Sequence, residues 1–426
     1  MTIVNGLLFL AHRVPYPPTK GDKIRSFNLL KHLGQRYQLY LGAFVDDPAD
    51  WAHESQLREL CHDVCLVNLK PGWRKILSLR ALLDGRPLSV AYFADSGMQR
   101  WVSNVLRTGA IRRALIFSSP MAQYVLHGSP PSGRGDLKTV MDFVDVDSDK
   151  WRMYAERHAW PMNRLYRMEA RRLLAYDRGV AAAADASVFV SQPEADLFRH
   201  LVPEVKTPIV SVENGVDTGY FSPDGEYETP YGEGDKVLVF TGAMDYWANV
   251  DAVSWFAREV FPHVRRRVPE AQFFIVGARP TDAVRRLREI AGVHVTGTVE
   301  DIRGYLHHAA IAVAPMRVAR GIQNKVLEAM SMAKPVVTTP AAMHGIHATD
   351  ELRSLVVDGE QAFAGRVIDL LTGGDAIRLG RLGREFVERR YRWSEMMAAF
   401  SSLLGEGEVS TAEGGTAVTM MVGEGG

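Results

Sequence analysis

The sequence has few cysteines, no excess of charge and no long apolar run. Its two cysteines, Cys61 and Cys65, have no second pair to complete a disulfide framework or a four-ligand zinc site, which fits a reducing compartment. Fifty basic residues balance fifty acidic ones, which argues against bulk electrostatic binding to nucleic acid. No stretch approaches about 18 uncharged apolar residues, so we expect no membrane-spanning helix.

Two sequence signals are missing as well. The N-terminal run lacks the basic leader and the length of a secretory signal, so the expected location is the cytoplasm. The first apolar run, residues 6–11, is not followed by the glycine pattern of dinucleotide-binding proteins. This absence disfavours a dehydrogenase.

The chain of 426 residues is too long for one compact core, and its apolar fraction of 46% is that of an ordinary soluble globular protein. Short apolar runs alternate with helical patterns, which predicts an α/β fold with doubly wound parallel sheets. A turn-rich segment near residues 206–235 divides the chain, so we expect domains at 1–205 and 206–385. A Gly-rich tail at 405–426 has little apolar periodicity and is expected to be disordered.

The apolar runs give the predicted strands of each half. In the first half they are 6–11, 37–45, 65–69, 114–119, 138–145 and 185–191. In the second half they are 237–243, 271–278, 293–299, 311–316, 335–340 and 354–357.

Residues 320–337, "RGIQNKVLEAMSMAKPVV", are typical of a loop, a helix, a turn and a buried strand. Lys325 falls in the first helical turn, where the positive end of the helix dipole disfavours a cation. A glycine ahead of a helix lets a ligand approach the backbone, and the free N–H groups there bind anions. A diphosphate over the helix end would explain Lys325, with Glu328 one turn further on as acceptor for a ribose diol. The alternative is a solvated helix with an incidental Lys–Glu contact.

Four segments resemble motifs of the retaining family-4 glycosyltransferases. "GIQNKVLEAMSMAKPVV" resembles the donor-site motif, and "VENGVDTGYFSP" is similar to the interdomain signature. "FTGAMDYWANVDAVSWF" occupies the place of the second domain's glycine loop, and "YPPTKGDKIRSFNLLKHL" resembles the N-terminal glycine loop. The resemblance covers about residues 3–404. Together with "MDFVDVDSDKW", the pattern is most similar to the sugar transferases of bacterial exopolysaccharide and exosortase (PEP-CTERM) systems.

The resemblance implies a GT-B fold, in which two Rossmann-like domains face each other across a cleft. It implies that the first domain binds the acceptor, that the second binds the nucleotide-sugar, and that a C-terminal helix at 386–404 packs back on the first domain. The donor-binding residues implied in this way are Gly242, Asn249, Gly321, Asn324, Lys325 and Glu328. Those expected on the acceptor and diphosphate side are Lys20, Gly21, Asp22, Lys23, Arg25 and Ser119.

Two places depart from the family pattern. Arg320 stands where many members carry a glutamate that meets the transferred sugar. "AMDYWANV", with Asp245 and Asn249, replaces an Arg and a Lys that neutralise the donor diphosphate. Arg320 is a candidate for part of the missing positive charge, and we count it with Lys325 among the candidate catalytic residues.

The segment "MDFVDVDSDKW" places Asp142, Asp145 and Asp147 at a strand end. These carboxylates are candidates to orient an acceptor hydroxyl, which makes Asp142 and Asp145 candidate catalytic residues. Alternatively they cap the following helix, or they bind a divalent metal, although such cages need more converging oxygens. Ser119 either faces the cleft or caps the next helix. A solvated helix start explains at least half of the charges around Gly21.

Two segments, 72–83 and 150–174, interleave aromatic residues with basic ones. Such patterns suit docking on an anionic lipid surface, which a lipid-linked acceptor requires. The alternative is that these helices pack on their own domain, with long cationic stems lying over apolar surface.

Together these features predict a metal-independent retaining glycosyltransferase without a cofactor. It transfers a sugar from a nucleoside-diphosphate-sugar to a lipid-linked glycan of exopolysaccharide synthesis, with peripheral contact to the inner face of an anionic membrane and no nucleic acid partner. The resemblance implies that the leaving diphosphate takes the acceptor proton, while fixed charges stabilise it. The alternatives are a GT-B nucleotide-sugar epimerase and a catalytically silent nucleotide-sugar-binding subunit.

Overall fold

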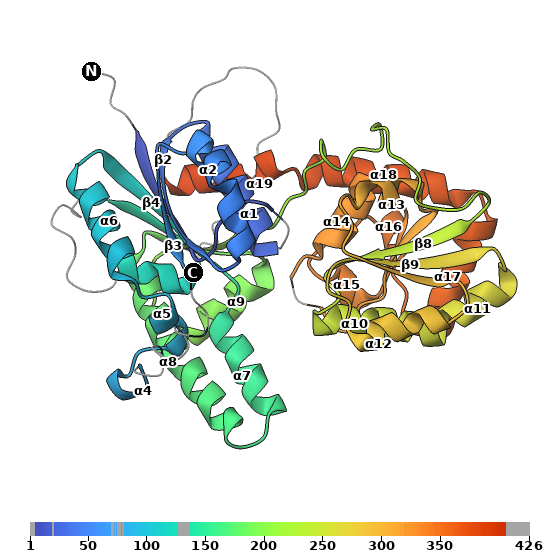
Figure 1. Ribbon diagram of the computed structural model, residues 1–426, viewed down its shortest axis with the longest axis horizontal. Helices are drawn as coiled ribbons and strands as arrows, with labels where there is room; N and C mark the ends of the chain where they lie inside the picture. Colours follow the sequence, from blue (N-terminus) through green and yellow to red (C-terminus); the bar gives the residue numbers. More distant parts are fainter. Residues whose placement is uncertain are drawn as a thin grey trace, which may run out of the picture.

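The computed structural model describes residues 5–18, 21–69, 72, 74, 78, 81–126, 137–319 and 321–405. Two α/β domains lie side by side along the long axis of the molecule (Figure 1). Lys20, Arg320 and residues 406–426, for which the sequence made specific predictions, lie outside the described residues, as does most of the basic segment 72–80.

A seven-stranded parallel sheet forms the first domain, with strand order β3-β2-β1-β4-β5-β6-β7. Its strands are β1 (Gly6–Ala11), β2 (Gln38–Val45), β3 (Asp63–Asn68), β4 (Ile111–Phe117), β5 (Lys138–Val144), β6 (Ala186–Phe189) and β7 (Ile209–Ser211). Its helices are α1 (Gly21–Gly34), η1 (Pro48–His53), α2 (Glu54–Leu60), α4 (Ala81–Asp84), α5 (Leu88–Tyr92), α6 (Ser96–Arg107), η2 (Ser119–Tyr124), α7 (Asp147–Arg157), α8 (Met162–Ala183) and α9 (Gln192–Leu201).

Helices cover both faces of this sheet, which explains why its strands are continuous apolar runs. Side chains alternate along β1, so Leu8 and Leu10 belong to the core under α6, α8 and α9. Leu7, Phe9 and Ala11 belong to the opposite core, which α1, α2 and α19 (Trp393–Leu403) cover. The burial of both faces fixes the register of the strand, and the C-terminal ends of the strands share one edge.

The second domain is a five-stranded parallel sheet with strand order β10-β9-β8-β11-β12 around one continuous core. Its strands are β8 (Lys236–Thr241), β9 (Ala271–Val276), β10 (Val293–Gly297), β11 (Ile311–Ala314) and β12 (Val336–Thr338). Its helices are α10 (Trp247–Trp255), the π-helical η4 (Phe256–Val260), α11 (Phe261–Arg267), α12 (Asp282–Arg285), η5 (Arg286–Glu289), α13 (Arg303–His308), α14 (Asn324–Ser331), α15 (Pro340–Met343), α16 (Asp350–Arg353), α17 (Glu360–Thr372) and α18 (Asp375–Arg390).

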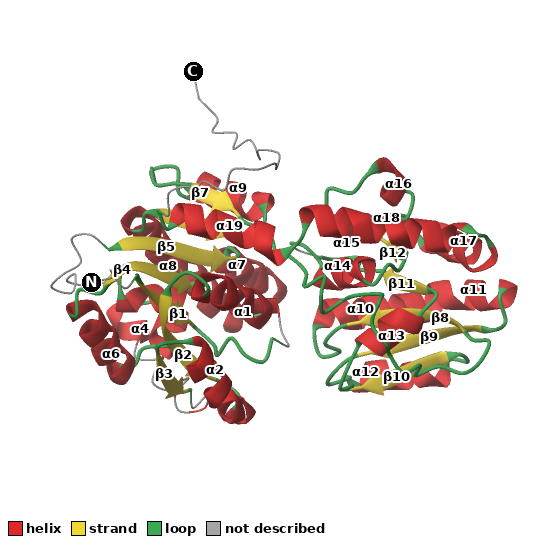
Figure 2. Ribbon diagram, turned by 90° about the horizontal axis from the view of Figure 1, so that it is seen from above, coloured by secondary structure: helices red, strands yellow, loops and turns green. Residues whose placement is uncertain are grey.

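The chain crosses back to the first domain at Tyr391 and Arg392 (Figure 2). Helix α18 packs on the second domain, whereas α19 buries Trp393, Met397 and Phe400 in the first. Gly215, from the interdomain signature, runs so close to this crossing that a Cβ atom there would lie 2.8 Å from the carbonyl oxygen of Tyr391. The signature glycine therefore lets the connector and the crossing meet.

Three details differ from the sequence-based expectations. Residues 354–357 form no strand, because α16 ends at Arg353 and α17 begins soon after, which leaves only one bridge between Val356 and Thr338. The segment 386–404 is not one helix, since α18 ends at Arg390 and α19 begins at Trp393. Strand β7 lies inside the expected connector and pairs with β6, so the first sheet extends beyond residue 205.

None of the described helices combines the length and the apolar character needed to cross a bilayer.

Candidate active site

A glycine directly follows each of the strands β8 and β9. Gly242 follows β8 with φ +156°, and Gly277 follows β9 with φ +155°. A Cβ atom on Gly277 would lie 1.7 Å from the carbonyl oxygen of Gly242, so only glycine fits. The two loops therefore meet backbone to backbone and expose peptide groups at the edge of the sheet, where ligands bind in open α/β sheets.

Lys325 lies directly beside this glycine turn. A Cβ atom on Gly242 would be 3.2 Å from the Lys325 ammonium, which donates a hydrogen bond to the Asn249 side-chain oxygen at 2.6 Å. The ammonium also lies 4.2 Å from the centroid of the Phe240 ring, a cation–π contact. The structure thus brings Gly242, Asn249 and Lys325 together, although α10 and α14 are far apart in sequence.

Asn249 is buried and held by both of its polar atoms. Its amide nitrogen donates to the carbonyl oxygen of Ala243 at 2.9 Å, and this contact directs its oxygen toward Lys325. Asn249 orients the Lys325 ammonium without neutralising it, because an amide oxygen carries no formal charge.

Burial and Glu328 set the charge state of this pocket. Burial lowers the pKa of Lys325 to about 7, although the nearby Glu328 carboxylate opposes the shift. Burial raises the pKa of Glu328 to about 7, with the charge of Lys325 acting in the other direction. An anionic ligand near Lys325 would favour its protonated form and raise its pKa.

The N-terminus of α14 has unmet hydrogen-bonding capacity. Gln323 forms no side-chain hydrogen bond that caps the helix, and the buried side-chain oxygen of Asn324 has no partner. Gly321 lies just ahead with φ +61°, and a Cβ atom there would be 3.7 Å from Val190 of the first domain. The predicted donor loop therefore lies near the first domain, and its helix end suits an anion.

The sequence did not reveal the cations that flank this pocket. Arg279 lies in the loop after β9 and forms an ion pair with Asp245 at 2.6 Å. Asp245 belongs to the segment in which the family's Arg and Lys are missing. Arg317, after β11, forms an ion pair with Asp251. Their positions after strands β9 and β11 are the only sequence signal for either residue.

Arg384 also escaped the sequence-based prediction. Its guanidinium donates to the carbonyl oxygens of Ser331 at 2.6 Å and of Phe221 at 2.7 Å. Helix α18 thereby anchors the C-terminal end of α14 and, through α14, the position of Lys325.

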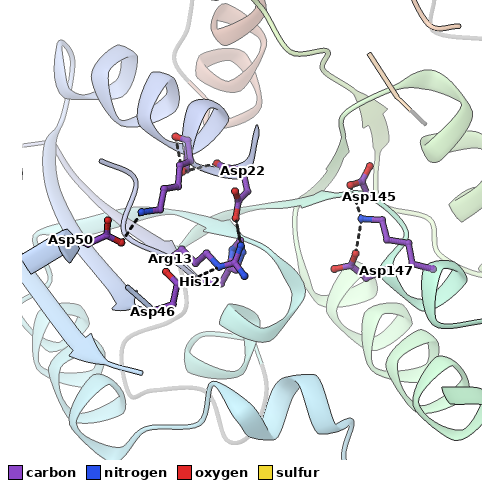
Figure 3. A network of polar contacts seen from close by, with 10 residues as sticks. His12, Arg13, Asp22, Asp46, Asp50, Asp145 and Asp147 are labelled. Atoms are coloured by element: carbon purple, nitrogen blue, oxygen red, sulfur yellow. Dashed lines mark hydrogen bonds and ion pairs between the residues drawn. The ribbon is translucent and has the colours of Figure 1, made fainter. Parts of the chain in front are cut away.

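In the first domain, Asp22 is the centre of a polar network beside Gly21 (Figure 3). His12 lies 3.3 Å and Arg13 lies 2.9 Å from the same Asp22 oxygen, and Arg13 also forms an ion pair with Asp46 at 3.0 Å. Burial would raise the pKa of Asp22, but His12 and Arg13 outweigh it and hold that pKa well below its usual range. The position of His12 directly after a predicted strand, in "AHR", is the sequence feature that could have identified it. Its ring stacks on Phe117.

Two other predicted cations of this domain that the structure describes, Lys23 and Arg25, have carboxylate partners. Lys23 binds Asp50 at 2.6 Å. Arg25 is fully buried and binds Asp142 at 2.8 Å, together with the carbonyl oxygen of Val212. Arg25 also donates to Asn214, so it ties the first domain to the interdomain connector. The catalytic role of Asp142 stays a prediction, which its complete burial does not favour.

Asp145 and Asp147 face one cation, not a vacant site. Lys150 donates to Asp145 at 2.7 Å and to Asp147 at 2.9 Å (Figure 3). Burial would lower the pKa of Lys150, but the two carboxylates outweigh it and raise that pKa. Across the part of the chain that the structure describes, no three His, Cys, Asp or Glu side chains converge as metal ligands.

Ser119 is buried at the start of η2, where its hydroxyl faces Asp177. Burial raises the pKa of Asp177 well above its usual range, although the hydrogen bond with Ser119 opposes this shift. The contact lies within the first domain, and the structure does not bring Ser119 together with Lys325.

Comparisons with known proteins support the fold and a family resemblance of the second domain. Residues 235–373 match the family described as "Glycosyl transferases group 1". Over 252 residues the chain is 29% identical to the GDP-mannose-dependent alpha-(1-6)-phosphatidylinositol monomannoside mannosyltransferases of two Mycobacterium tuberculosis strains. That similarity covers 53% of this chain and 63% of the length of those relatives.

Solved structures confirm the expected GT-B fold. Anabaena Alr3699/HepE, in complex with UDP and glucose, is 14% identical with a TM-score of 0.61, covering 94% of this chain and 99% of that one. WaaG, a glycosyltransferase involved in lipopolysaccharide biosynthesis, is 13% identical with a TM-score of 0.61, covering 94% and 100%. The resemblance to group 1 glycosyltransferases is thus confirmed for the second domain, and the GT-B fold for the chain.

Proposed function

We propose that this protein is a retaining glycosyltransferase that takes a sugar from a nucleoside-diphosphate-sugar bound to its second domain. One observation carries the proposal: Lys325, Asn249 and the bare Gly242 turn come together at the C-terminal edge of the sheet, with Glu328 one turn behind Lys325. The match of residues 235–373 to group 1 glycosyltransferases and the HepE complex with UDP and glucose support it.

In this proposal Lys325 and the N-terminus of α14 bind the donor diphosphate. The free oxygen of Asn324 and the carboxylate of Glu328 accept hydrogen bonds from donor hydroxyls. Negative charge builds up on the diphosphate as the glycosidic bond breaks, and a preorganised cation in a partly buried site stabilises it. Lys325 and, as the sequence predicts, Arg320 supply positive charge, and the proposal includes no metal ion and no cofactor.

We further propose a lipid-linked glycan as the acceptor and exopolysaccharide synthesis as the setting, at the inner face of a membrane. The curated relatives act, by their names, on phosphatidylinositol monomannoside, which is a lipid-anchored sugar. The turn between α7 and α8 exposes Trp160 and Met162, which suits contact with lipid.

The test begins with donor binding. Isothermal titration with UDP, GDP and a panel of nucleotide-sugars should reveal one preferred donor, and Lys325→Ala should abolish that binding. Transfer is then followed with a membrane extract as source of acceptor, by release of nucleoside diphosphate, and the anomeric configuration of the product is read by NMR.

Each alternative has its own outcome. Donor binding without turnover on any acceptor identifies a silent binding subunit. A new nucleotide-sugar formed without acceptor identifies an epimerase. An inverted anomeric configuration contradicts the retaining mechanism.

A further inference from the structure

A cationic groove lies in the first domain, away from the residues assigned above to the donor. Helices α7 and α8 run side by side as a hairpin that extends from the sheet (Figure 1). The groove has a volume of about 550 Å³, and its lining includes Arg152 on α7 and Arg164, Arg167 and Arg171 on α8. On a helix, positions 164, 167 and 171 share one face, so the three arginines form a single row.

This row has positive charge without a local counterion. Arg152 is paired with Asp149 at 2.7 Å and with Glu156 at 2.6 Å. Arg164, Arg167 and Arg171 are exposed, and no ion pair or hydrogen bond of their side chains is found within the described residues. Asp149 and Glu156 therefore account for the charge of Arg152, and three arginines of the groove remain without a carboxylate partner.

A buried hydroxyl gives a second, independent observation. Ser148 lines the same groove, is only 3% exposed, and its hydroxyl oxygen has no hydrogen-bond partner. A buried hydroxyl without a partner costs free energy that a ligand oxygen would recover. Ser148 and the arginine row therefore point to an oxygen-rich anion.

The groove is not wholly polar. Ala170, Leu174 and Leu201 contribute apolar surface to its lining, beside the methylene stems of the arginines. At the hairpin turn Trp160 is 73% exposed and Met162 is 39% exposed. An anion that is attached to an apolar chain fits this combination better than a free ion in water.

We propose that this groove binds the diphosphate by which an acceptor glycan is joined to its lipid. A diphosphate concentrates more negative charge than the single phosphodiester of a membrane phospholipid, which matches the three uncompensated arginines. Guanidinium groups bind phosphate oxygens in bidentate geometry, and the Ser148 hydroxyl donates a further hydrogen bond. The inference rests on the proposed function, because it defines how the acceptor is held.

The experiment measures binding of the full chain to phosphatidylcholine vesicles by flotation. One set of vesicles contains a polyprenyl diphosphate, and a second contains phosphatidylglycerol at equal surface charge. The variant is Arg164→Gln/Arg167→Gln/Arg171→Gln. Its matched control, Arg258→Gln/Arg266→Gln/Arg286→Gln, removes three exposed arginines of the second domain.

The wild-type chain should bind the diphosphate vesicles more tightly than the phosphatidylglycerol vesicles. The triple variant should lose about tenfold or more of that affinity, while the control triple keeps it. Ser148→Ala should weaken binding to the diphosphate vesicles alone, by about threefold. If circular dichroism shows that the triple variant does not fold, the single variants Arg167→Gln and Ser148→Ala replace it in the same binding experiment.

Equal binding to both kinds of vesicle, or equal losses in both triple variants, would overturn the proposal in favour of general charge attraction. Full competition by inorganic pyrophosphate at similar affinity would overturn the lipid-linked ligand. Titration with UDP and GDP separates the groove proposal from the proposed function. If nucleotides bind but the diphosphate vesicles do not, only the groove proposal is refuted. If the wild-type chain binds no nucleotide, the proposed function is refuted.

Discussion

In the first domain Lys23 binds the carboxylate of Asp50 at 2.6 Å, whereas in the second domain Lys325 binds the amide oxygen of Asn249 at the same distance. Arg25 and Lys150 follow the first pattern, with Asp142 and with Asp145 and Asp147. A carboxylate neutralises its cation, but an amide only orients it. The contrast teaches that cations paired with carboxylates hold the first domain together, whereas Lys325 keeps charge available for a ligand.

Breaking the Arg25–Asp142 pair should have the largest effect. Arg25→Met leaves Asp142 buried and unpaired, which should lower the free energy of unfolding by about 3–5 kcal/mol. Urea unfolding measures the loss, and Arg25→Met/Asp142→Leu should recover much of it. Unchanged stability with lost transfer would instead support a catalytic role for the pair.

Lys325→Ala should come next. Removing the cation that stabilises the leaving diphosphate should slow transfer about a hundred- to a thousandfold, with the circular dichroism spectrum unchanged. Lys236→Ala, which removes a partly exposed lysine paired with Glu270, is the matched control and should keep normal turnover. Wild-type turnover in Lys325→Ala would refute the diphosphate assignment.

Asn249→Asp gives Lys325 the kind of partner that Lys23 has. The new carboxylate should compensate the ammonium and weaken the binding of UDP or GDP about tenfold in titration calorimetry. Asn104→Asp, an exposed change of the same kind, serves as the control. Tighter nucleotide binding in Asn249→Asp would contradict the contrast between the domains.

The smallest effect is the pH dependence of nucleotide binding. Burial places the pKa of free Lys325 at about 7, so the ammonium loses its proton as the pH rises above that value. A bound diphosphate favours the protonated form, so affinity should fall by up to about tenfold per pH unit above pH 7. Lys325→Arg, which does not deprotonate, should flatten the curve measured between pH 7 and 9.

The sequence predicted the repeated βα pattern and the main site residues of the second domain. Lys325 was proposed because it breaks a local rule, as a cation at a helix N-terminus, and Glu328 because it follows one turn further on. Gly242 was implied by the family resemblance. Pairs between distant segments were missed, among them Arg279 with Asp245 and Arg384 with Ser331. In the sequence alone, one arginine has many plausible ion-pair or hydrogen-bond partners, and the fold decides which of them lies within reach.

The sequence alone determined that strands buried on two faces alternate with helices, and that Lys325 opens a helix after a glycine. Those features depend on local patterning, which is written in consecutive residues. Only the tertiary structure decided which cations are paired with carboxylates. Lys325 binds Asn249 and Arg25 binds Asp142, whereas Arg164, Arg167 and Arg171 have no ion-pair partner among the described residues. Whether two charged side chains pair depends on the distance between the elements that carry them, and the fold sets that distance.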